Sequence, residues 1–249
     1  MPRLIVLKNG IEDLKNNIST IKTSVEHNSY CLLRGLYSEE QCKNAVHRIL
    51  NNISQAKILP SKGVSRSQIR QNVVKWSVGS MSGSQAGISR LMVTAMNPLG
   101  EEDIYEMHST FKKLIIARDM IAERSRVYWD KDLSGGLFNG TRIQVYPSGG
   151  GFMTAHQDTT AANSVGEIGR ESYIQLVLLL TQKGVEYQNG GAFIKQNNLL
   201  IDVEANSLRG DVLVYDGRTE HGVMDIDPDD PLSTDLSSGR IVAMATIYS

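Results

Sequence analysis

Residues 141–158 read TRIQVYPSGGGFMTAHQD. The stretch begins with a β-type run, Thr141–Tyr146, and then turns at the sequence Pro-Ser-Gly-Gly-Gly of residues 147–151. It ends on His156-Gln157-Asp158. Residues i and i+2 of a strand point to the same face, so this spacing can place an imidazole and a carboxylate side by side.

More short β-type runs follow this stretch, and Gly and Asn turns separate them. They are Tyr173–Thr181, Ala192–Lys195, Leu199–Val203, Asp211–Tyr215 and Arg240–Tyr248. Many short strands joined by such turns are typical of an all-β sandwich or a jelly roll.

The N-terminal 130 residues have a different pattern, which indicates helices with one or two strands. Tyr30–Arg34 predicts a short strand, and Ser38 with Gln41 three residues later predicts a capped helix that runs to about Asn52. A longer helix is expected over Glu101–Tyr128, because apolar residues recur there at helical spacing. Residues 55–100 are expected to form ordered, irregular loops around a site.

The predicted fold is therefore α+β with a mainly β core. The core is a double-stranded β-helix (a jelly-roll or cupin-like barrel), and helices from the N-terminal half support it. We expect one domain over 1–249. Residues 1–135 supply the helical support and line the substrate pocket, and residues 136–249 form the jelly-roll core.

Composition narrows the class of protein. The 249 residues carry a net charge of −1, which argues against a nucleic-acid partner, since such proteins usually have a basic excess. Two cysteines are too few for a disulfide scaffold, and the apolar run near the N-terminus is too short for a secretory signal. No apolar stretch is long enough to span a membrane. We expect a soluble, cytoplasmic protein that does not bind membranes.

A second histidine and an arginine complete the chemical pattern. His221 follows the run Asp211–Tyr215, and Arg240 lies near the start of the last strand. Two imidazoles and a carboxylate on neighbouring strands can form the facial triad that binds Fe(II) and leaves three positions open. A buried arginine suits a carboxylate ligand, because its planar fork can bond both oxygens.

In this order, His156-x-Asp158, His221 and Arg240 resemble the HxD…H…R signature of the Fe(II)/2-oxoglutarate-dependent dioxygenases. The resemblance covers about residues 140–248. It implies that the triad binds Fe(II), that Arg240 holds the distal carboxylate of 2-oxoglutarate, and that Tyr146 faces this cosubstrate. O2 would be the second cosubstrate, with ascorbate in a supporting role.

The spacing leaves open which arginine holds 2-oxoglutarate. His221 and Arg240 are 19 positions apart, which is longer than in many relatives, so Arg218 and Arg142 are alternative holders of 2-oxoglutarate.

The resemblance implies hydroxylation, desaturation or cyclisation at an unactivated C–H bond of a small molecule, such as an amino acid or a natural-product intermediate. Because Asp158 is present, halogenation is disfavoured. Candidate substrate-binding residues are Arg66, Trp76, Arg90 and Gln157. Two alternatives stay open: an oxygenase that acts on a protein or a nucleic acid, and a jelly-roll protein that binds metal without turnover. The sequence does not define the oligomeric state.

Overall fold

The computed structural model describes residues 3–53, 57–59, 66–80, 87–123, 138–158 and 173–248. Its helices are α1 (Ile11–Asn28), α2 (Glu39–Asn52), α3 (Arg66–Ile69) and α4 (His108–Ile121). Its strands are β1 (Leu4–Val6), β2 (Tyr30–Arg34), β3 (Lys57–Leu59), β4 (Val73–Ser80), β5 (Ser89–Met96), β6 (Phe138–Pro147), β7 (Gly151–His156), β8 (Ile174–Leu179), β9 (Gly191–Gln196), β10 (Leu199–Asp202), β11 (Val212–Asp216), β12 (His221–Ile226) and β13 (Gly239–Tyr248).

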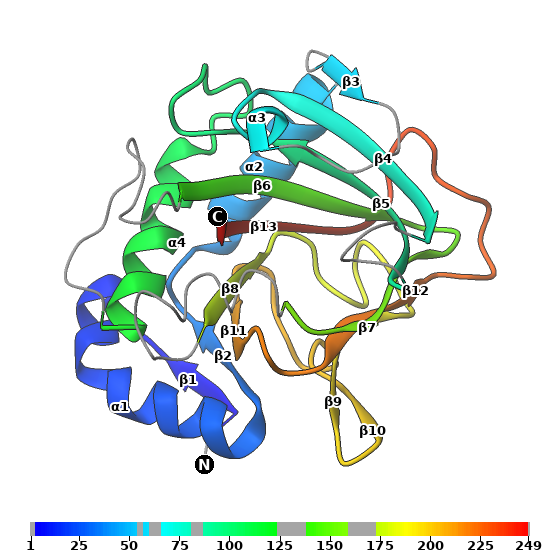
Figure 1. Ribbon diagram of the computed structural model, residues 1–249. Coiled ribbons are helices and arrows are strands. Elements are labelled where there is room, and N and C mark those ends of the chain that lie inside the picture. The colour runs from blue at the N-terminus through cyan, green and yellow to red at the C-terminus, as the bar shows by residue number, and fades with distance from the viewer. Residues whose placement is uncertain are drawn as a thin grey trace.

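These strands form one sheet of 13 strands within the described residues, and the sheet folds back on itself (Figure 1). The strand order is β1-β2-β11-β8-β13-β6-β5-β7-β12-β9-β10, and β4 and β3 continue from β5 off this path. The fold occurs at β5, which pairs with β6 along Val93–Met96 and with β7 along Arg90–Leu91. The larger half of the sheet therefore faces the smaller half, β7-β12-β9-β10. We call the space between them the lumen.

Successive side chains of a strand point to opposite faces of the sheet, so one face of the larger half lines the lumen and the other contacts the helices. On β6, Ile143 and Val145 belong to the core shared with the helices, whereas Tyr146 packs with residues of both sheet halves. The helices α1, α2 and α4 bury their apolar stripes against the outer face, for example through Leu14, Ile49 and Phe111. The mainly β core with supporting helices is thus confirmed, and the helices lie along one side of the sheet (Figure 1).

Several local predictions are confirmed, because they depend on short-range signals. The strand β2 has the predicted bounds, and α2 runs from Glu39 to Asn52 after a Ser38 N-cap. The reciprocal capping box is present, since Gln41 N–H donates to the Ser38 hydroxyl and the Gln41 side chain accepts from Ser38 N–H.

Two predictions for the N-terminal half are wrong. The part predicted as irregular loops contains β4 and β5, which join the sheet. The predicted helix 101–128 begins only at His108, because Glu106 has a left-handed backbone (φ 52°) that a helix cannot continue through. Instead, Asp103 accepts hydrogen bonds from the backbone N–H groups of Met107 and His108. The end of that predicted helix, residues 124–128, lies outside the described residues.

None of the helices that the structure describes has the length and apolar character needed to cross a bilayer.

Candidate metal centre and cosubstrate pocket

Two antiparallel strands of the smaller sheet half bring the two histidines together. His156 ends β7, His221 begins β12, and the two residues are direct partners in the ladder. Their rings lie 4.4 Å apart between centroids. Asp158 follows β7 by two residues, and its backbone N–H donates to the carbonyl of Gly217 over 2.7 Å. This bond holds the Asp158 carboxylate near His221, which lies four residues after Gly217.

The three side chains converge on one point. One potential ligand atom from each of His156, Asp158 and His221 lies within 4.8 Å of the others. Each Nε2 atom is 3.8 Å from an oxygen of the Asp158 carboxylate. Among the described residues this is the one group of three or more His, Cys, Asp or Glu side chains arranged to hold an ion. The residue types and the geometry fit the 2-His-1-carboxylate facial triad of a non-heme iron site.

Backbone carbonyls orient both imidazoles. The Nδ1 atom of His156 lies 2.9 Å from the carbonyl oxygen of Thr154, and the Nδ1 atom of His221 lies 2.8 Å from that of Thr219. If each Nδ1–H donates to its carbonyl, each Nε2 carries the free lone pair and points toward the metal position. Burial and, after it, the charge of the neighbouring His221 lower the pKa of His156 to about 4, so this imidazole is neutral at pH 7.

Two more lumen side chains contact the triad. The Gln175 side-chain amide donates to the Asp158 carboxylate over 3.3 Å, and the Tyr215 hydroxyl lies 3.3 Å from Nε2 of His221. Both come from the larger half of the sheet, on β8 and β11. The metal position therefore lies in the lumen between the two sheet halves.

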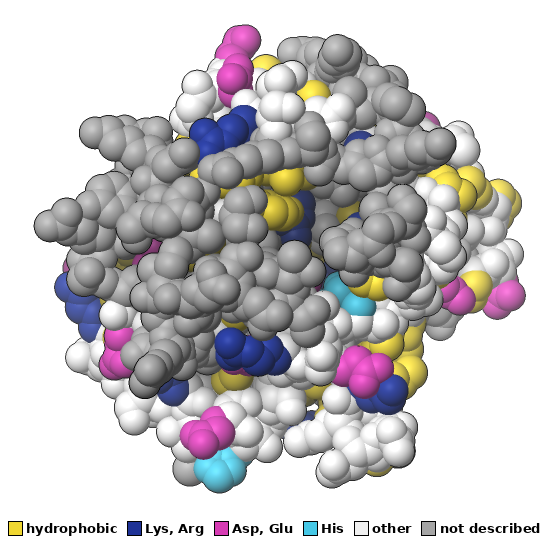
Figure 2. Space-filling view, viewed as in Figure 1, with side chains coloured by type: hydrophobic (Ala, Val, Ile, Leu, Met, Phe, Trp, Pro, Cys, Tyr) yellow, Lys and Arg dark blue, Asp and Glu magenta, His cyan; other side chains and the backbone are white. Residues whose placement is uncertain are grey.

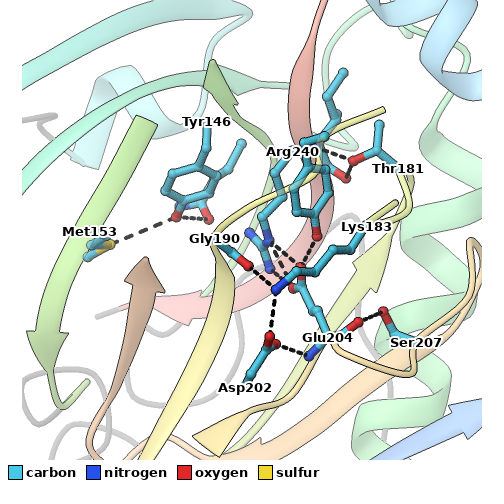
Figure 3. A network of polar contacts seen from close by, with 12 residues as sticks. Tyr146, Met153, Thr181, Lys183, Gly190, Asp202, Glu204, Ser207 and Arg240 are labelled. Atoms are coloured by element: carbon cyan, nitrogen blue, oxygen red, sulfur yellow. Dashed lines mark hydrogen bonds and ion pairs between the residues drawn. The ribbon is translucent and has the colours of Figure 1, made fainter. Parts of the chain in front are cut away.

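Arg240 lies one residue into β13 and pairs in register with Tyr146 on β6. Its side chain is 4% exposed, and it forms a buried ion pair with Glu204, whose side chain is 1% exposed (Figure 3). Nε of Arg240 donates to both Glu204 oxygens over 2.9 and 3.0 Å, and Nη2 donates over 2.5 Å. One edge of the guanidinium is thus already bonded to a carboxylate of the same chain.

Neighbouring residues besides Arg240 also accommodate the Glu204 carboxylate. The Tyr187 hydroxyl also donates to it, and a Cβ at Gly191 would lie 3.0 Å from its Oε2 atom, so glycine leaves room for it. Burial alone would raise the pKa of Glu204, but the charge of Arg240 and these hydrogen bonds hold it below its ordinary value. Glu204 is therefore an ionised, structural counter-charge.

A second edge of Arg240 stays available to a ligand. Nη1 has no hydrogen-bond partner among the described residues, and the guanidinium lies 5.2 Å from the centre of the Tyr146 ring. Among the described residues, the Tyr146 hydroxyl makes only long contacts, at 3.3 Å to Gln144 and 3.9 Å to the Met153 sulfur (Figure 3). A carboxylate ligand fits between these groups, since a guanidinium can bond one carboxylate on each of two edges.

The other candidate residues are dispersed. Arg218 is 47% exposed on its side chain and lies 3.8 Å from Asp216 at the surface. Arg142 points into the lumen from β6, and Arg90 lies on the lumen face of β5. Trp76 packs against the core on the helix side, away from the lumen, and Gln157 is exposed. The side chain of Arg66 lies outside the described residues.

Three buried residues in or beside the lumen were not predicted from the sequence: Glu204, Tyr187 and Lys75. Glu204 follows β10 in a segment without a recognisable motif, so no local signal could have paired it with Arg240. Lys75 carried a weak signal, because it alternates with the apolar residues Val74 and Trp76 along β4.

Comparison with known proteins agrees with the fold. No family model matches the sequence, and no curated protein matches it significantly. Solved structures do match. A prolyl hydroxylase from Trichoplax adhaerens, in complex with a peptide fragment of the hypoxia-inducible factor oxygen degradation domain, is 11% identical and has a TM-score of 0.56. The alignment covers 96% of this chain and 91% of that one.

Two other matches are named as a prolyl-4-hydroxylase and as an epimerase. A prolyl-4-hydroxylase from Pseudomonas putida is 10% identical, with a TM-score of 0.53 and coverage of 92% of this chain and 97% of that one. SnoN, a non-heme α-ketoglutarate-dependent epimerase from nogalamycin biosynthesis, is 12% identical, with a TM-score of 0.55 and coverage of 94% and 83%. At these identities the likeness establishes a shared fold: the chain has the fold of the 2-oxoglutarate- and Fe(II)-dependent oxygenases, as the sequence pattern indicates.

Proposed function

We propose that this protein is an Fe(II)- and 2-oxoglutarate-dependent oxygenase that oxidises an unactivated C–H bond of a small molecule, such as an amino acid or a natural-product intermediate. One observation carries the proposal. Three ligand side chains, His156, Asp158 and His221, converge in the lumen of a fold that is shared with enzymes of this chemistry.

The chain's own residues would hold the ion and leave room for reactants. Three ligands on one face of an octahedron leave the opposite positions to cosubstrate and oxygen. When bound, the ferrous ion and 2-oxoglutarate supply the oxidising chemistry. The carbonyls of Thr154 and Thr219 keep both Nε2 atoms directed at the ion, which raises their affinity for it. A purely structural metal site would instead be closed by a fourth protein ligand.

The cosubstrate pocket follows from the position of Arg240. Its free Nη1 and the weakly bonded hydroxyl of Tyr146 would take the distal carboxylate of 2-oxoglutarate, while Glu204 holds the guanidinium from behind. Arg218 is too exposed for this role. Strands from both halves of the chain join the same sheet, which supports one catalytic unit over the whole chain.

A small-molecule substrate is favoured by the depth of the triad. The side chains of His156 and His221 are about one tenth exposed, and that of Asp158 about one quarter. Figure 2 shows a hollow in which Lys or Arg atoms lie beside hydrophobic atoms, with a histidine close to it. Matches to solved structures include one enzyme in complex with a peptide fragment of a protein and one named for natural-product biosynthesis, so the test must also include protein substrates.

The experiment measures Fe(II) binding without oxygen and then succinate formation with 2-oxoglutarate and O2. We expect one ion per chain and slow succinate release, which rises when a library of amino acids and other metabolites contains the substrate. His156→Ala should lose both, whereas His47→Ala, which changes an exposed histidine on α2, should keep both. Wild-type protein that binds neither Fe(II) nor 2-oxoglutarate would contradict the proposal. Stimulation by a protein extract but by no metabolite would replace the small molecule with a macromolecular substrate.

A further inference from the structure

Three cationic side chains occupy the lumen face of three neighbouring strands. They are Lys75 on β4, Arg90 on β5 and Arg142 on β6. The register places them on one face: Lys75 is opposite Thr94, Thr94 is opposite Gln144, and Arg142 is two residues from Gln144. Side chains two residues apart on a strand share a face, so this set lies on the same side of the sheet as Tyr146.

The cations influence one another, so their charges lie close together. Burial lowers the pKa of Lys75, and the charge of Arg90 lowers it further. Burial also lowers the pKa of Arg90, and the charge of Arg142 acts in the same direction. The Asp158 carboxylate acts on both arginines with the opposite sign, which places the cluster beside the triad.

Two members of the cluster, Lys75 and Arg142, have no ion pair with the residues that the structure describes. Lys75 is 2% exposed, yet it makes no hydrogen bond or ion pair with the residues that the structure describes. Within the same residues, Arg142 donates one hydrogen bond, to the Tyr248 hydroxyl, and forms no ion pair. By contrast, Glu204 neutralises Arg240 on the same side of the sheet. Buried charges without partners are costly, and they persist where a ligand supplies the missing charge.

The iron and its cosubstrate would not remove this imbalance. Fe(II), the Asp158 carboxylate and a 2-oxoglutarate dianion together carry a net charge of roughly −1, against the two cations Lys75 and Arg142. Among the described residues no further carboxylate pairs with Lys75 or Arg142, so an anionic group of a bound molecule would balance them, and a carboxylate or a phosphate matches their donors.

We infer that Lys75 and Arg142, with the added charge of Arg90, bind an oxyanion of the substrate, so that this enzyme oxidises a carboxylate- or phosphate-bearing small molecule. The inference rests on the proposed oxygenase function and names its substrate class. The oxyanion would hold one end of the substrate at the β4–β6 side of the lumen and leave a carbon of the same molecule near the triad.

The first test uses metal-free protein, so that it does not depend on turnover. Inorganic phosphate and, separately, acetate are titrated at constant ionic strength, with calorimetry and thermal melting as readouts. Wild-type protein should bind at least one of these anions in preference to chloride. Lys75→Met and Arg142→Gln should each weaken that binding about tenfold or more, as expected for the loss of a charge-assisted hydrogen bond.

The matched control is Arg218→Gln, which removes the same charge from an exposed position and should leave the affinity unchanged. Arg142→Lys keeps the charge, so it should retain most of the binding and guards against misfolding of the glutamine variant. Tighter binding of phosphate assigns a phosphorylated substrate, and tighter binding of acetate assigns a carboxylic acid. Wild-type protein that binds neither anion, or Lys75→Met and Arg142→Gln variants that bind like wild type, would overturn the inference.

A second test separates substrate from cosubstrate. Mn(II)-loaded Arg142→Gln should bind 2-oxoglutarate within about threefold of wild type, since a charge that does not contact the ligand acts only at long range. If 2-oxoglutarate binding falls together with phosphate binding, the cluster is the cosubstrate site and the inference is wrong. Wild-type protein that binds phosphate but neither Mn(II) nor 2-oxoglutarate would contradict the proposed function and leave the anion site supported.

Discussion

Replacing Glu204 by glutamine removes the counter-charge of a buried arginine. The two side chains are 1% and 4% exposed, and three hydrogen bonds of 2.5–3.0 Å join them. Removing one partner of a buried pair costs about 3–5 kcal/mol, because the other charge stays in a poorly solvated place. At about 2–4 °C of melting temperature per kcal/mol for a chain of this size, we expect Glu204→Gln to melt about 6–20 °C below wild type.

Thermal melting at pH 7, followed by circular dichroism, measures this difference. Glu123→Gln is the control, because Glu123 is exposed and pairs with Lys22 at the surface, where such a pair contributes less than about 1 kcal/mol. The double variant Glu204→Gln/Arg240→Gln should recover part of the loss, since no buried charge then lacks a partner. A Glu204→Gln protein that melts within the range of the Glu123→Gln control would refute the reasoning.

The same pair predicts an acid dependence. The folded protein holds the pKa of Glu204 below its ordinary value of 4.5, so the unfolded chain binds the proton more readily. The stabilising contribution is therefore complete above that value and is lost as the pH falls through the lowered pKa. The gap in melting temperature between wild type and Glu204→Gln should be largest at neutral pH and should shrink below about pH 4.5. A gap that widens in acid would contradict an ionised Glu204.

Three further perturbations have expected outcomes. Burial raises the pKa of Cys31 to about 12 and that of Cys42 to about 11, so a thiol reagent at pH 8 should modify neither in the folded protein and both after denaturation. Gly217→Ala should weaken Mn(II) binding in calorimetry, because its Cβ would lie 3.2 Å from that of Asp158 and 2.4 Å from a tyrosine ring; unchanged affinity would mean that the loop absorbs the methyl group. Ser38→Ala removes the cap of α2 and should lower stability by about 1 kcal/mol in urea unfolding, whereas a loss near zero would show that water replaces the hydroxyl.

The sequence predicted the features that depend on neighbouring residues. The capping box of Ser38 needs only four residues, and the spacing of His156 and Asp158 needs three, so both could be read from the chain. The Gly and Asn turns likewise marked most strands of the jelly roll. These local signals were sufficient for the fold class and for the candidate metal ligands.

Features that depend on distant residues could not be predicted. The strand β4 resembled a loop because Lys75 and Ser77 interrupt its apolar residues, although both face the lumen rather than water. The pair of Glu204 and Arg240 joins residues 36 positions apart through the folded sheet, and neither strand periodicity nor composition indicates it. The sequence therefore indicated Arg240 as a candidate, but not the carboxylate that already bonds one of its edges.

The pairing of His156 with His221 also joins two segments that are distant along the chain. The two residues are 65 positions apart, and in the metal-free protein the ladder between β7 and β12 holds them together. A bound ion would add a second tie at the end of that ladder and close the intervening chain into a ring. Closing a ring restricts the unfolded chain more than the folded one, so the ion would act as a reversible cross-link. Chelation should therefore loosen the smaller half of the sheet first, and slowed hydrogen exchange in β7 and β12 would report how fully the ion is bound.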